Sequence, residues 1–131
     1  MASVASSSAA LSPAERRALV RRYKEMPPPM GVFAVRNLVD RRAWVGASMN
    51  LAGALHRARF ELQQRGHRVA ALQADWTRLG AQAFAFEVVD TLKPQDDPAH
   101  DYRAELDALL ALWTEEFGRR GELGYQAGAA R

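Results

Sequence analysis

Arginine side chains are the chemical groups that stand out in this sequence. The chain holds 18 basic residues, and only Lys24 and Lys93 among them are lysines. A planar guanidinium donates two parallel hydrogen bonds to a phosphate, which a lysine ammonium does not match. We therefore expect a phosphate-binding surface beside a central hairpin and the helix after it. Its candidate residues are Arg36, Arg41, Arg42, Arg57, Arg59, Arg65 and Arg68.

A second basic block lies near the start of the chain, between residues 16 and 24, where five of nine residues are basic. Two interpretations remain open for it: a solvated helix face, or an arm that contacts phosphates and makes binding salt-dependent. The net charge of +3 and the pI of about 9.8 are compatible with a nucleic-acid partner. A bulk charge this small does not establish such a partner.

Acids and histidines gather at Asp96, Asp97, His100 and Asp101. This group has metal-ligand residue types, but we favour a solvated loop in which Asp101 caps the next helix. The chain has no cysteine, which excludes disulfides and thiolate metal sites. We expect no metal site from these residues.

The composition, 48% hydrophobic and 25% charged over 131 residues, indicates one globular domain. No apolar run reaches the roughly 18 residues of a membrane span. Residues 1–11 lack the features of a secretory signal, so we expect a disordered tail there and a cytoplasmic protein.

Local signals divide the chain into elements. Ser12 and Glu15 form a capping box for a helix that ends before the prolines at 27–29. We therefore expect an N-terminal helix and linker at 12–29, a domain at 30–126 and a frayed tail at 127–131. Within the domain, the patterns predict strands at 31–37, 43–47 and 83–90, and helices at 51–65, 69–79 and 101–117.

Several short motifs lie at informative positions in these elements. They are Gly-Val-Phe at 31–33, Trp-Val-Gly at 44–46, Ala-Leu-Gln-Ala-Asp-Trp at 71–76, a Phe-rich strand at 80–88 and Gly-Tyr-Gln at 124–126. In this order the chain resembles the GIY-YIG nuclease family, and most closely a subgroup of small stand-alone bacterial proteins. The resemblance implies an α/β (α+β) fold, with a short three-stranded antiparallel sheet flanked by helices, plus the N-terminal helix.

The resemblance also implies a chemistry, the hydrolysis of a phosphodiester with one Mg²⁺ or Mn²⁺ ion. The family uses tyrosines near the nucleophile, an arginine for the developing charge and a glutamate for the metal. Here Phe33 and Trp44 stand at the tyrosine positions, Ala54 at the arginine position and Leu110 at the glutamate position. An indole N–H donates a hydrogen bond but cannot accept a proton. We therefore expect the standard site to be degenerate.

The remaining motif positions are mixed. The family histidine four residues after the arginine falls on Ala58, and the final asparagine falls on Gln126. Arg57 lies almost one helical turn beyond Ala54, and His67 matches a family histidine. The candidate catalytic positions are therefore Phe33, Trp44, Arg57 and His67, with no metal ligand assigned. For His67 a local hydrogen-bonding role is the alternative, and we expect His56 at the surface.

Three functions remain open. The first, which we favour, is a domain that binds nucleic acid, including single-stranded DNA, and does not cleave it strongly. The second is an active endonuclease in which Arg57, His67 and Glu105 regroup and Mg²⁺ or Mn²⁺ is bound. The third is a protein-interaction module with an apolar patch around Phe33 and Trp44. Trp44 either packs in the hairpin or offers a platform for an unpaired base.

Overall fold

The computed structural model of the protein describes residues 12–25 and 28–125. The tails expected at 1–11 and 127–131 lie outside the described residues, as do Gln126 and the linker residues 26 and 27. Among the described residues, no helix is long and apolar enough to cross a membrane.

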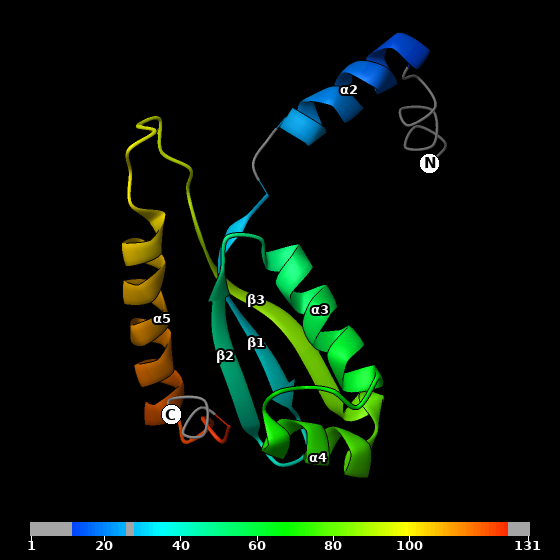
Figure 1. Cartoon of the computed structure of the whole chain (residues 1–131), viewed down its shortest axis with the longest axis vertical. Helices are drawn as coiled ribbons and strands as arrows, with labels where there is room; N and C mark the ends of the chain where they lie inside the picture. The colour runs from blue at the N-terminus through cyan, green and yellow to red at the C-terminus, as the bar shows by residue number, and fades with distance from the viewer. Residues whose placement is uncertain (1–11, 26–27, 126–131) are drawn as a thin grey trace, which may run out of the picture.

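A three-stranded antiparallel sheet forms the centre of the molecule (Figure 1). Its strands are β1 (Met30–Asn37), β2 (Arg42–Ser48) and β3 (Phe84–Leu92), in the order β2-β1-β3. Strands β1 and β2 form the predicted hairpin, with Phe33 opposite Gly46. Strand β3 pairs with the other edge of β1. The predicted strands and the expected α+β class are confirmed.

The described residues form four α-helices, α2 (Pro13–Glu25), α3 (Leu51–Gln63), α4 (Ala70–Leu79) and α5 (Tyr102–Arg119), with a short 3-10 helix, η1 (Ala81–Ala83), before β3. The predicted caps are in place. The Asn50 side chain accepts from the Gly53 N–H at 3.0 Å, and Asp101 accepts from the Ala104 N–H at 3.0 Å. Helix α3 ends two residues earlier than expected, and Arg65, just beyond it, adopts a left-handed φ of 60°.

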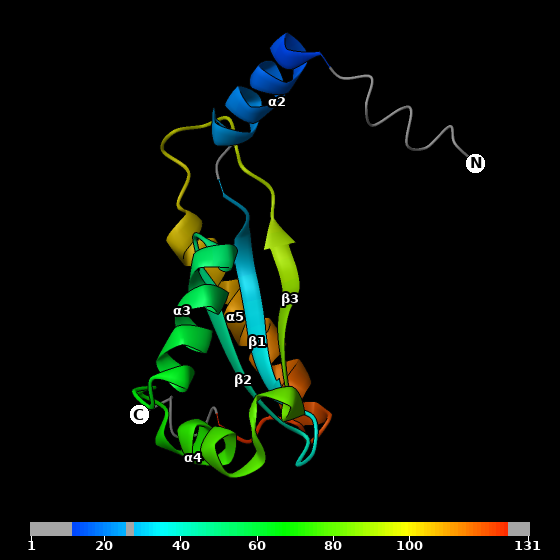
Figure 2. The same ribbon diagram turned by 90° about the vertical axis from the view of Figure 1, so that its right-hand side faces the viewer.

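The strand alternation places the helices on opposite faces of the sheet (Figure 2). Phe33, Val35 and Trp44 point toward α3 and α4, whereas Val32 and Val45 point toward α5. Trp76 is 8% exposed and packs on Phe84 on the first face. Trp113 is half-buried on the second face, and its Nε1–H donates to Asp90 at 2.9 Å.

The aromatic ring of Phe33 lies over Gly46 of the neighbouring strand. A Cβ atom added at Gly46 would be 2.6 Å from the ring, closer than any ordinary contact. The glycine therefore gives the ring room on the sheet, and this packing does not require a hydroxyl on the ring.

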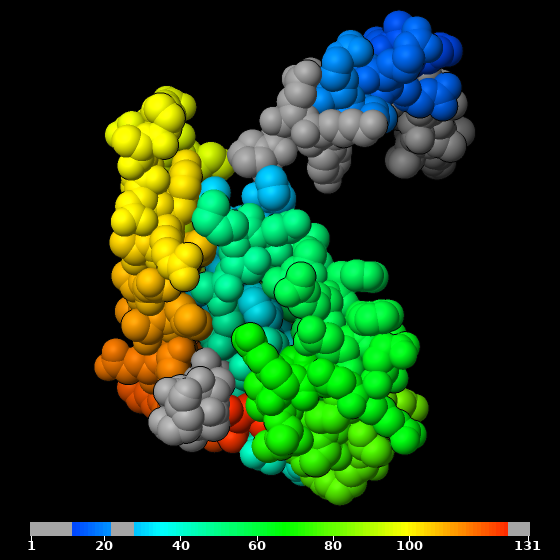
Figure 3. Space-filling model, in the orientation of Figure 1, coloured from blue at the N-terminus to red at the C-terminus, as the bar shows by residue number. Residues whose placement is uncertain are grey.

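Helix α2 lies apart from the sheet and the other helices (Figure 3). Its capping box is confirmed, because the Ser12 N–H donates to Glu15 at 2.8 Å and the Glu15 N–H donates to Ser12 Oγ at 3.1 Å. The side chains described in it are all exposed.

The carboxylate of Asp75, on α4, is buried at 7% exposure and connects three distant segments. It accepts hydrogen bonds from Tyr125 Oη at 2.5 Å, Arg42 at 2.9 Å, Arg78 at 2.9 Å and Asn37 at 3.3 Å. Asn37 ends β1, Arg42 begins β2 and Tyr125 lies near the C-terminus. Burial opposes ionisation, but the hydrogen bonds from Tyr125 and Arg78 and the nearby arginine charges lower the pKa of Asp75 overall.

Replacing Asp75 by asparagine should destabilise the protein by about 3 kcal/mol at pH 7, because two arginines and Tyr125 lose an ionised acceptor. A carboxyl group with a lowered folded-state pKa stabilises the fold above its unfolded pKa of about 4, and that contribution disappears as the pH falls further. Urea unfolding of Asp75→Asn and the unmodified protein at pH 7 and pH 3 measures this. A stability difference that does not shrink at pH 3 would contradict it.

Candidate functional site

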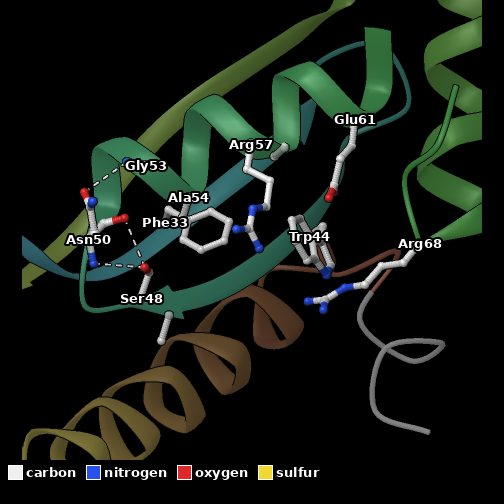
Figure 4. A pocket seen from close by; sticks show the side chains of 11 residues that line it. Phe33, Trp44, Ser48, Asn50, Gly53, Ala54, Arg57, Glu61 and Arg68 are labelled. Carbon is white, nitrogen blue, oxygen red and sulfur yellow. Dashed lines mark hydrogen bonds between the residues drawn. The ribbon is translucent and has the colours of Figure 1, made fainter. Parts of the chain in front are cut away.

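A cleft of about 420 Å³ opens between α3 and the edge strand β2 (Figure 4). The loop between α3 and α4 borders its far end. Its lining residues are Phe33, Trp44, Ala47, Ser48, Asn50, Gly53, Ala54, Arg57, Ala58, Glu61 and Arg68. The four positions that the GIY-YIG resemblance assigns to the first two strands and the following helix, 33, 44, 54 and 58, therefore all line one cleft.

The floor of the cleft is aromatic. Phe33 and Trp44 meet edge to face, with ring centroids 5.5 Å apart. Trp44 also contacts the His67 ring at 4.8 Å, and the Arg68 guanidinium lies 5.5 Å from the Trp44 ring centroid. Because these neighbours leave Trp44 only 6% exposed, its geometry favours packing in the hairpin over a platform for an unpaired base.

The walls of the cleft carry charge. Arg57 and Glu61 lie one turn apart on α3, and Arg68 reaches in from the loop before α4 (Figure 4). Within the described part of the chain, none of these three side chains forms an ion pair within 4.0 Å. Two arginines and one half-buried carboxylate are therefore available to a ligand.

The end of the cleft near β2 is closed by polar groups that already have partners. The Ser48 hydroxyl donates to the Asn50 carbonyl and accepts from the Asn50 N–H, each at 3.0 Å. The Asn50 side chain caps α3. These groups shape the cleft and hold the first turn of α3, while the arginines supply its free charge.

His67 lies behind Trp44 and does not line the cleft. Its Nδ1 accepts from the Val69 backbone N–H at 3.1 Å, and the His67 backbone N–H donates to Gln73 Oε1 at 3.0 Å. Burial lowers the pKa of His67. The negative charge of Glu61 acts in the opposite direction, and the positive charge of Arg68 lowers the pKa further. A buried, neutral histidine that fixes the loop fits the local role better than direct contact with a ligand. His56 is exposed, as expected.

The other candidate arginines separate into two groups. Arg36 pairs with Glu87 and Glu122 at 3.4 Å, Arg41 pairs with Glu122 at 3.7 Å, and Arg42 pairs with Asp75.

On α3, the Arg59 guanidinium lies over the Phe86 ring at 4.3 Å. Arg65 is exposed beyond the end of α3. Of the seven candidate arginines, Arg57 and Arg68 line the cleft.

The acids of α5 lie away from the cleft. Leu110, at the position of the family glutamate, packs against the core cluster on the opposite face of the sheet. Glu105 lies 2.6 Å from His100 Nε2, so the structure does not regroup it with Arg57 and His67. The loop at 96–101 supplies the Asp101 cap, and no group of three or more acids and histidines among the described residues is placed to hold a metal.

Glu61 is the cleft residue that the sequence interpretation missed. Its signal is the four-residue spacing from Arg57, which places both side chains on one face of a helix. That spacing is common on solvated helices, so it becomes informative only once the cleft is known.

No protein-family model and no curated protein matches the chain. Two solved structures do. The catalytic domain of the homing endonuclease I-TevI aligns with a TM-score of 0.59 at 17% identity, over 73% of this chain and 95% of that domain. A point mutant of the I-TevI catalytic domain aligns with a TM-score of 0.58 at 14% identity, over 72% and 90%. This chain has the fold of the I-TevI catalytic domain. The fold expected from the GIY-YIG resemblance is confirmed, and at these identities the likeness concerns the fold alone.

Glu61 is the one carboxylate among the described residues that line the cleft. Mg²⁺ is usually bound by one or two carboxylates together with water and substrate phosphates. A cation in this cleft would therefore have Glu61 as its protein carboxylate, while the Ser48 and Asn50 oxygens are already engaged in hydrogen bonds at the start of α3.

Replacing His67 by glutamine should make stability less dependent on pH below neutrality. The unfolded chain binds a proton near pH 6.5, whereas the folded chain resists it because the lowered pKa keeps the imidazole neutral. Stability should therefore fall from pH 7.5 to pH 5 in the unmodified protein and fall less in His67→Gln. Thermal unfolding at both pH values, with His56→Gln as the exposed-histidine control, measures this. Equal losses in all three proteins would contradict the assignment.

Proposed function

We propose that this protein binds nucleic acid through the cleft between α3 and β2, with a degenerate form of the GIY-YIG nuclease site. The observation that carries the proposal is the pair of arginines, Arg57 and Arg68, that face one cleft without an ion-pair partner in the described chain. A nuclease-like fold supports it, and the small bacterial GIY-YIG subgroup remains our proposed family assignment.

Phosphate groups suit the cleft better than bases do. Trp44 and Phe33 are buried and already in contact with neighbouring rings, which leaves no open aromatic face for stacking. The guanidinium groups of Arg57 and Arg68 donate charge-assisted hydrogen bonds that match phosphate oxygens. We therefore expect binding that depends on salt and tolerates different sequences.

The groups at the motif positions favour binding without hydrolysis. Phe33 has no hydroxyl, the indole of Trp44 accepts no proton, and Ala54 and Ala58 present methyl groups to the cleft. A protein-interaction module remains the third candidate. The charged walls count against it, because the apolar residues at the cleft are its buried floor.

Replacing Arg57 and Arg68 by glutamine should weaken DNA binding about tenfold or more at 50 mM salt, because each substitution removes a charge-assisted hydrogen bond to a phosphate. Fluorescence anisotropy with labelled single- and double-stranded DNA, at 50 and 200 mM salt, measures this. A matched control, Lys93→Gln with Arg103→Gln, removes two exposed charges that have no ion pair among the described residues. An equal loss in the control, or no binding by the unmodified protein at low salt, would contradict the proposal.

The second candidate, an endonuclease with a rearranged site, is favoured by one observation, the carboxylate of Glu61 in the cleft. The two candidates differ in what Glu61→Gln does. If the cleft only binds phosphates, removing its negative charge should tighten DNA binding several-fold, because like charges repel.

If the cleft cleaves DNA, the same substitution should abolish cleavage in Mg²⁺ or Mn²⁺. Anisotropy without metal and gel analysis of labelled DNA with metal separate the two results. We expect tighter binding and no cleavage by either protein. Cleavage by the unmodified protein that Glu61→Gln removes would favour the endonuclease.

A further inference from the structure

Helix α2 is a basic element that the cleft does not include. We propose that α2 is a second phosphate-binding element, which extends the path of the nucleic acid beyond the cleft. This inference rests on the proposed function, because it assigns α2 the same strand that the cleft binds.

The charge of α2 suits a polyanion. Arg16, Arg17 and Arg21 surround Val20 on one side of the helix, and all four side chains are exposed. Glu15, in the first turn of α2, is held in the capping box with Ser12. No described residue pairs with the three arginines. The side around Val20 is therefore a patch of free positive charge.

Helix α2 joins the rest of the protein near one end of the cleft. The carbonyl of Pro29, just after the linker, accepts a hydrogen bond from the Leu51 N–H at 2.9 Å. Leu51 begins α3 next to Asn50, which lines the cleft. Four residues separate Glu25 from Met30, so their Cα atoms are five steps and at most about 18 Å apart. The C-terminal end of α2 therefore lies close to the start of α3, at the Asn50 end of the cleft (Figure 1).

The length of α2 sets how long an oligonucleotide must be to contact both the cleft and this helix. Its 13 residues extend about 20 Å, which is the rise of about six nucleotides in one strand of B-DNA. An oligonucleotide that fills only the cleft should therefore not reach most of α2. A longer one should contact both elements.

An apolar partner for α2 is a weaker explanation. Leu19 and Val20 are about half exposed, at 47% and 52%, but Val20 lies among three arginines. Charge around so small an apolar group favours an anionic surface over a protein groove.

The test uses the full chain with Arg16, Arg17 and Arg21 replaced by glutamine. The α5 control replaces Arg103 and Arg119 of α5 and Arg120 directly after it, which removes the same net charge; Arg119 and Arg120 pair with Glu116. Binding to 6-nucleotide and 18-nucleotide oligo-dT is measured by anisotropy from 50 to 300 mM salt. Thermal unfolding checks that both variants keep the fold.

We expect the α2 variant to bind the 18-mer at least tenfold more weakly and the 6-mer within twofold of the unmodified protein. For the 18-mer, the slope of log affinity against log salt concentration should become less negative by up to about 2, which is about 0.7 for each lost phosphate contact. The α5 control should change neither length selectively.

Three outcomes would overturn the inference. One is an α2 variant with unchanged affinity and salt slope on the 18-mer. If Arg57→Gln with Arg68→Gln still weakens binding in that case, the proposed function holds and the role of α2 does not. Another is an equal loss in the α5 control, which would reflect bulk charge. The third is a dimer, seen by analytical ultracentrifugation without DNA, that the α2 substitutions dissociate. If the unmodified protein binds neither oligonucleotide, the proposed function itself fails.

Discussion

The buried carboxylate of Asp75 is the interaction on which the arrangement of the site depends. A charge withdrawn from water is tolerated only when several donors satisfy it. Those donors come from the end of β1, the start of β2 and Tyr125 near the C-terminus, so one carboxylate fixes α4 against the hairpin. Helix α4 directly follows the loop that holds His67 and Arg68 against Trp44. One wall of the cleft therefore depends on a group outside it.

Ion pairing divides the arginines by role. Arg36, Arg41, Arg42 and Arg78 each have a carboxylate within 4.0 Å, which neutralises much of their field. Arg57 and Arg68 have none among the described residues. Whether an arginine is available to a phosphate thus depends on which acids the fold brings to it. Composition and net charge do not contain that information.

The elements could be predicted because their signals are local. Asn50 and Asp101 cap helices through groups three residues away, and alternating apolar residues identify β3 without knowledge of its partner. The site was predicted less completely, because its contacts join distant segments.

Glu61 enters the cleft, and Glu105 stays outside it, because strand alternation places α3 and α5 on opposite faces. The His100 partner of Glu105 and the Trp44 partner of His67 are likewise consequences of packing. A sequence motif identifies where an element begins, whereas the unpaired charges that a ligand meets depend on the assembled fold. For this protein, those charges favour phosphate binding, since the aromatic floor is packed and only the walls remain open.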